Sequence, residues 1–126
     1  MPDPPRKVGA FEQANPPAVD GPRPDFDPSS AFAAILSGDA PAHVLLETEH
    51  AMGFLDASPY CAGHCLLIPK APGYASMLDL PQEAAAQVLK EVPRLARAVA
   101  KATGCDGVNV WQNNGPAARQ EVFHLP

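Results

Sequence analysis

The sequence predicts an α+β domain in which an antiparallel sheet of about five strands packs against one long and one short helix. Three observations lead to this prediction. The chain has 126 residues, enough for one domain, and 46% of them are apolar. Short apolar segments bounded by turn residues follow one another through its middle. One stretch, 81–103, carries apolar residues at helical spacing.

The domain is expected to occupy residues 29–126, after a disordered Pro-rich tail at 1–28. Half of the 16 prolines fall in this tail, which shows no periodic apolar pattern. Such a stretch cannot bury enough surface to offset its ordering entropy. Order is expected to begin with a short helix at 31–37, because Ser30 is a good N-cap and Gly38 a good C-terminal stop.

The strands are expected in a mostly meander-like order. Their ranges are 43–48, 52–56, 64–69, 107–112 and 121–125. The last of these would lie in the middle of the sheet, and we expect it to be cut short because the sequence stops just after it. A shortened central strand exposes backbone groups and apolar surface.

The long helix is expected at 81–103. Pro81 suits its first turn, and Gly104 ends it. Its apolar stripe recurs at spacings of 4, 3 and 4, at Val88, Val92, Leu95 and Val99. Pro93 lies inside this range and removes one backbone hydrogen bond, so we expect a kink or a break there.

The charge and apolar pattern exclude several classes of partner. A net charge of −5 with scattered basic residues argues against nucleic acid, whose phosphates need a basic surface. No apolar run approaches the length of a membrane span. The N-terminus lacks the apolar core of a signal peptide, so we expect a cytoplasmic protein.

The three cysteines are expected to be free thiols. An odd count without an export signal favours a reducing compartment. Cys61, His64 and Cys65 are close enough in sequence to suggest a metal site. However, His64 and Cys65 would point to opposite faces of a strand, and no second ligand pair appears at zinc spacing. We therefore expect no metal.

Four segments carry a specific pattern of residues. They read FLDASP at 54–59, GHCLLIPK at 63–70, NVWQNNG at 109–115 and QEVFH at 120–124. In this order they resemble the histidine-triad (HIT) family of nucleotide-binding hydrolases and transferases, in its short bacterial branch. The resemblance covers residues 31–125.

The resemblance implies a site for a purine nucleoside monophosphate. Family members bind the base in an apolar slot beside a strand. The matching positions are Phe32, Ile35, Phe54 and Leu66. An ordinary core uses the same residue types, so both interpretations of these four residues stay open. Asp56 matches the carboxylate that accepts hydrogen bonds from both ribose hydroxyls.

Four further residues match positions around the phosphate and the triad. Asn113 matches a side chain that holds a phosphate or ribose-phosphate oxygen, and Gln120 one that contacts the leaving group or phosphate. His124 matches the first triad His, which orients the nucleophile. His64 matches a buried His that supports this orientation, although alone it would be read as a satisfied core histidine.

In the family, the second triad His attacks the α-phosphorus and forms a nucleotidyl-His intermediate that water resolves. The chain departs from this pattern at Pro126, which stands at the nucleophile position and can neither attack phosphorus nor donate a proton. Arg119 stands where relatives carry Gly beside the phosphate. Residues 31–34 replace the Cys-x-x-Cys of zinc-carrying relatives, so neither structural zinc nor another cofactor is expected.

Three hypotheses about function follow. The first is a hydrolase of nucleotide phosphoramidates or dinucleoside polyphosphates, which requires this chain to be a truncated form of a longer product. The second is a nucleotide-binding protein without the nucleophile, and the third is an interaction protein that uses the dimer surface or the Pro-rich tail. The resemblance implies a homodimer if the fold is complete. Because of Pro126, we expect the chain itself to be inactive or nearly so.

Overall fold

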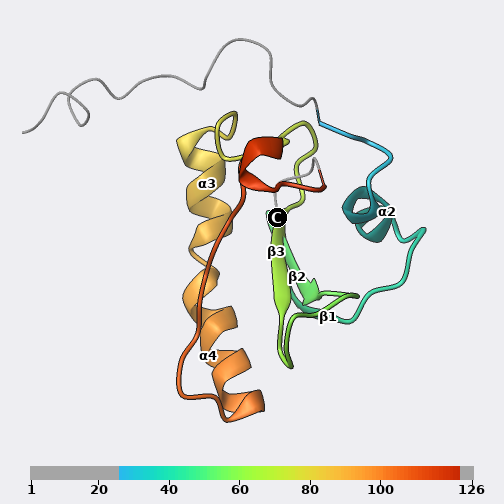
Figure 1. Cartoon of the computed structure of the whole chain (residues 1–126). Coiled ribbons are helices and arrows are strands. Elements are labelled where there is room, and N and C mark those ends of the chain that lie inside the picture. The colour runs from blue at the N-terminus through green and yellow to red at the C-terminus, as the bar shows by residue number, and fades with distance from the viewer. Residues whose placement is uncertain (1–25, 123–126) are drawn as a thin grey trace, which may run out of the picture.

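The computed structural model describes residues 26–122. In this range a three-stranded antiparallel sheet lies between one short helix and a pair of longer helices (Figure 1). The predicted α+β class with an antiparallel sheet is confirmed. Residues 1–25, which form most of the predicted tail, lie outside the described residues, as do the two C-terminal site positions His124 and Pro126.

The short helix α2 spans Ala31–Ser37, as the sequence predicts. The Ser30 side chain caps it by accepting a hydrogen bond of 3.1 Å from the backbone N–H of Ala33. Gly38 ends the helix in the left-handed conformation, with φ of 86°, which costs glycine little. Local capping signals therefore mark both ends of α2.

Three of the five predicted strands form the sheet. They are β1 at Val44–Glu47, β2 at Ala51–Leu55 and β3 at Cys65–Pro69, in the order β1-β2-β3. β2 is the central strand and pairs with β3 so that Phe54 faces Leu66 and Met52 faces Ile68. These four side chains share one face of the sheet because side chains alternate along a strand.

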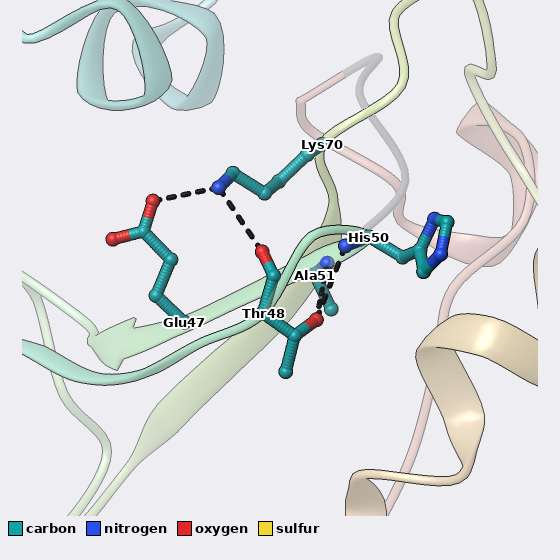
Figure 2. A network of polar contacts seen from close by, with 5 residues as sticks. All are labelled: Glu47, Thr48, His50, Ala51 and Lys70. Carbon is teal, nitrogen blue, oxygen red and sulfur yellow. Dashed lines mark hydrogen bonds and ion pairs between the residues drawn. The ribbon is translucent and has the colours of Figure 1, made fainter.

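A polar network closes the turn between β1 and β2 (Figure 2). The Thr48 hydroxyl accepts hydrogen bonds from the backbone N–H groups of His50, at 3.1 Å, and Ala51, at 3.0 Å. The Lys70 ammonium, just after β3, donates to Glu47 Oε1 at 2.7 Å and to the Thr48 carbonyl at 3.0 Å. The network ties the end of β3 to the hairpin turn, although ion pairs this exposed contribute little to stability.

The predicted long helix is broken in two. Helix α3 spans Gln82–Leu89 and α4 spans Val92–Thr103. Pro93 explains the break, because its ring clashes with the carbonyl four residues earlier, that of Leu89, which is the last residue of α3. No helix in the described part of the chain combines the length and apolar character needed to cross a membrane.

The core lies on both faces of β2. Met52, Phe54 and Ile68 are buried on the face covered by α2. On the other face, a Cβ at Gly53 would lie 3.5 Å from the side chains of Leu46 and of Leu95 in α4. Both faces of the central strand are thus covered, and β2 is nearly continuously buried.

The predicted strand at 107–112 is wrong for this structure. The segment has no strand conformation, and Val108, Val110 and Trp111 are 44%, 68% and 58% exposed. Alternating apolar residues favour a strand, but a strand exists only where a neighbour completes its hydrogen bonds. The predicted strand at 121–125 lies mostly outside the described residues, and its first two residues are not in a strand.

Candidate functional site

The structure brings the four predicted slot residues together. Phe32 and Ile35 on α2 pack with Leu66 against the buried cluster that contains Phe54. The rings of Phe32 and Phe54 meet edge to face, with centroids 5.7 Å apart. This geometry is common for buried aromatic pairs. The four residues therefore lie in the layer between α2 and the sheet, which is the core of this half of the domain.

Asp56 and His64 continue this face beyond the strand ends. Asp56 comes two residues after Phe54 and His64 two residues before Leu66. The strand pairing extends to them, since the Asp56 backbone N–H donates to the His64 carbonyl at 3.0 Å. Their side chains approach each other, with His64 Nε2 3.5 Å from Asp56 Oδ2. A carboxylate–imidazole pair thus lies at the end of the apolar face.

The Asp56 carboxylate is held in a fixed orientation. Its Oδ1 accepts a hydrogen bond of 2.8 Å from the backbone N–H of Ser58, which is an Asx turn. Its Oδ2 faces His64. An ionised carboxylate offers about four lone-pair sites, so two remain for hydroxyl donors. The side chain is 24% exposed and so remains accessible.

His64 is fixed by the loop that joins β2 to β3. The backbone N–H of Tyr60 donates to His64 Nδ1 at 3.1 Å. Because Nδ1 accepts, the proton of the neutral ring is on Nε2, the nitrogen that faces Asp56. The Tyr60 ring stacks on the imidazole, with centroids 5.3 Å apart and planes 9° apart, and Trp111 lies against both rings.

Two further predicted site residues, Asn113 and Gln120, lie within the described range and bond to other segments of the chain. Gln120 is buried, and its amide donates to the carbonyls of Ala75 and Val122 while its oxygen accepts from the Gly115 N–H at 2.7 Å. The Asn113 amide donates to the Arg119 carbonyl at 3.4 Å. Among residues 26–122, neither Asn113 nor Gln120 is hydrogen bonded to Asp56 or His64. In this conformation the Gln120 side chain links the backbone at Ala75, Gly115 and Val122.

Sequence reasoning missed several residues that lie near the predicted ones. Ser58, Tyr60 and Trp111 support Asp56 and His64, and Asn114 accepts a hydrogen bond of 2.7 Å from the Met77 N–H. The Asp-x-Ser pattern at 56–58 is a readable signal for an Asx turn. No sequence signal predicts that rings at 60 and 111 meet, because this contact depends on the path of a long loop.

A hollow of about 280 Å³ lies away from these residues. It sits near the β1–β2 turn, and its lining includes Glu49, His50 and Gln87 but none of the predicted site residues. Lys70 also lines it, but its ammonium is already paired with Glu47 and the Thr48 carbonyl (Figure 2). The hollow therefore offers no unpaired lysine to a phosphate.

Metal ligands do not gather in the described part of the chain. No group of three His, Cys, Asp or Glu side chains there is placed to hold an ion. All three cysteines are free thiols. Burial raises the pKa of the Cys65 thiol, which keeps Cys65 protonated and a poor nucleophile.

Arg119 has its backbone in the left-handed region. It has φ of 66° and is the single non-glycine residue with positive φ in the described range. Its N–H donates to the Pro116 carbonyl at 2.9 Å and closes the short helix η1, Pro116–Ala118. A side chain pays a steric penalty in this region that glycine avoids, so a Gly at this position would be unstrained.

Replacing Arg119 by Gly should therefore stabilise the domain. The strain relief exceeds the extra backbone entropy of Gly, and we expect a gain of roughly 0.5–1 kcal/mol in the free energy of unfolding. Urea denaturation measures it. Arg119→Ala is the matched control, because it removes the same charge but keeps the Cβ. Equal gains in both variants would mean that charge and not backbone strain is responsible.

The fold is a small α+β domain in which an apolar layer between α2 and the sheet ends in the Asp56–His64 carboxylate–imidazole pair. The family description that matches residues 37–125 is the HIT domain, and the chain belongs to the HIT family.

Relatives and solved structures agree with this assignment. The chain is 39% identical to adenosine 5'-monophosphoramidase HNT1 of Saccharomyces cerevisiae over 79% of its length and 60% of that protein. It is 38% identical to adenylylsulfatase HINT3 of Arabidopsis thaliana over 74% of its length and 47% of that protein. A crystal structure of a HIT family member from Bacillus subtilis matches 77% of this chain and 68% of that one, with 37% identity and a TM-score of 0.74. The chain thus spans between about half and two thirds of these relatives.

Proposed function

We propose that this domain binds a purine nucleoside monophosphate, with the base between α2 and the sheet and the ribose on Asp56. The observation that carries the proposal is the position of Asp56. Its carboxylate lies on the same face as Phe54 and Leu66, is held from two sides, and keeps lone pairs for two hydroxyl donors. A vicinal diol donates two hydrogen bonds to one carboxylate, as a ribose requires.

The proposed reaction class is nucleotidyl transfer to water or another acceptor. Two relatives carry the names adenosine 5'-monophosphoramidase and adenylylsulfatase, both of which denote cleavage at an adenylyl group. By the family pattern, the route runs through a nucleotidyl-His intermediate. Gln120 would act near the phosphate only if it released its present backbone partners, since its amide is fully engaged. Asn113 would act there through its amide, which now donates to the Arg119 carbonyl.

The favoured form of this proposal for the present sequence is binding without catalysis. Proline stands at the position of the nucleophilic His, and its nitrogen is part of a tertiary amide without a free lone pair for attack. The slot and Asp56 do not depend on residue 126. Nucleotide binding and turnover are therefore separate predictions for this chain. A homodimer and a cytoplasmic location remain further proposals.

Replacing Asp56 by Ala should weaken the binding of AMP by roughly 1–3 kcal/mol, because two ribose hydroxyls lose their acceptor. Isothermal titration with AMP measures the difference. Asp106→Ala is the matched control: Asp106 is exposed and the change in net charge is the same. Equal affinity of the Asp56→Ala variant and the unmodified chain would exclude Asp56 as the ribose anchor. An equal loss in the control would assign the effect to overall charge.

A further inference from the structure

Two aromatic side chains have no role in the proposed nucleotide site: Tyr60 in the loop between β2 and β3, and Trp111 in the segment after α4. Tyr60, at 83% exposed, and Trp111, at 58%, are among the most exposed large side chains of the described residues. They nevertheless pack on one partner, since Tyr60 stacks on the His64 ring and the Trp111 ring centroid lies 6.1 Å from it. Because both exposed rings contact His64, they are placed to fix the orientation of the His64 ring.

The contacts form a chain that ends at the proposed ribose anchor. The Tyr60 N–H fixes Nδ1 of His64 as an acceptor. This places the ring proton on Nε2, 3.5 Å from Asp56 Oδ2. The opposite carboxylate oxygen, Oδ1, is held by the Ser58 N–H. The orientation of the Asp56 carboxylate thus depends on His64, and that of His64 on Tyr60.

The same loop is seated on helix α4. A Cβ at Gly63 would lie 2.8 Å from the Thr103 Cγ2 and 3.0 Å from the Val99 Cγ1, so the backbone approaches the helix as closely as glycine allows. Gly63 also has φ of 86°. The Cys61 carbonyl accepts from the His64 N–H at 3.1 Å and closes the turn. The loop therefore packs on α4 at Gly63, and the Tyr60 ring packs on His64 at the end of the loop.

We infer that Tyr60 is a positioning residue: its ring and its backbone N–H lock His64 as the Nε2–H tautomer directed at Asp56, so that the carboxylate is preset to receive the two ribose hydroxyls. The identity of the ligand in this inference rests on the proposed function, whereas the contacts among Tyr60, His64 and Asp56 do not. Trp111 supports the lock from the edge of the ring pair. The contacts of Tyr60 affect the binding of the ribose hydroxyls and not that of the base.

The test compares Tyr60→Ala with Tyr60→Phe, which keeps the stacked ring. The first readout needs no ligand: hydrogen exchange of the residue 60 amide, whose protection at this exposed position comes from the His64 Nδ1 bond. The second is the ratio of affinities for AMP and 2',3'-dideoxy-AMP, which reports the ribose hydroxyls alone. Val110→Ala, a change at an exposed residue of the segment that carries Trp111, is the control.

Tyr60→Ala should lose amide protection at residue 60, and its preference for AMP over the dideoxy compound should fall roughly three- to tenfold, the effect of one weakened hydrogen bond. Tyr60→Phe and Val110→Ala should retain both properties. Unchanged protection or an unchanged ratio in Tyr60→Ala would overturn the inference. If the unmodified chain binds neither nucleotide, the proposed function fails, and the amide protection alone decides whether Tyr60 locks His64.

Discussion

The chain with Pro126 should hydrolyse an adenosine phosphoramidate at close to the uncatalysed rate. The family reaction needs a neutral imidazole at this position to form a covalent bond to phosphorus. Neither of the two histidines that match the family site replaces it. His124 lies two residues earlier, and two residues along an extended strand correspond to about 7 Å. His64 is engaged by Tyr60 and faces Asp56.

A pair of extended chains isolates the effect of residue 126. Both carry, after residue 126, the segment that follows the triad position in the Bacillus subtilis relative. One also carries Pro126→His, and the other keeps Pro126. The His variant should gain turnover by several orders of magnitude and form a nucleotidyl adduct visible by mass spectrometry, because the members of a catalytic unit act together. Turnover with a covalent adduct in the Pro126 chain would show that the nucleophile lies elsewhere.

Replacing Phe54 by Ala should be the most damaging single change to stability in the described part of the chain. Phe54 is 2% exposed on the central strand and packs against Phe32 of α2. Its loss removes the aromatic contact and leaves a cavity between α2 and the sheet. We expect a loss of about 3–5 kcal/mol in the free energy of unfolding, a large share of the total for a domain of this size.

Leu55→Ala is the matched control for this prediction. Leu55 is the next residue on the same strand, points to the opposite side and is 36% exposed. Its truncation should cost much less than that of Phe54 in the same urea or thermal denaturation experiment. If both variants lose similar stability, the layer between α2 and the sheet is not the core described above.

The local elements of this fold were readable from the sequence because local chemistry determines them. Ser30 and Gly38 bound α2, and short apolar runs between turn residues mark the first three strands. Pro93 predicted an interruption of the long helix. The helix is interrupted between Leu89 and Val92, where the Pro93 ring would clash with the Leu89 carbonyl. The family resemblance implied that four apolar residues lie together, and the two-residue period of a strand puts the strand members on one face. These residues are Phe32, Ile35, Phe54 and Leu66.

The features that escaped prediction depend on contacts between distant segments. Val108 and Val110 have strand-forming side chains, yet no strand pairs with them in the described range. The stacking of Tyr60 on His64 arises from the path of the loop that Gly63 seats on α4. Likewise, the engagement of Gln120 with Ala75 joins residues 45 positions apart. Single-sequence patterns carry no direct signal for such pairs.

The central claim is that AMP binds between α2 and the sheet with its ribose at Asp56. A titration of the isotope-labelled chain with AMP, followed in ¹H–¹⁵N spectra, tests it most directly. Amide shifts should concentrate in α2, around Asp56 at the end of β2, and at His64 and Leu66. Shifts confined to the hollow at His50 and Gln87, or no shifts at saturating AMP, would contradict the claim.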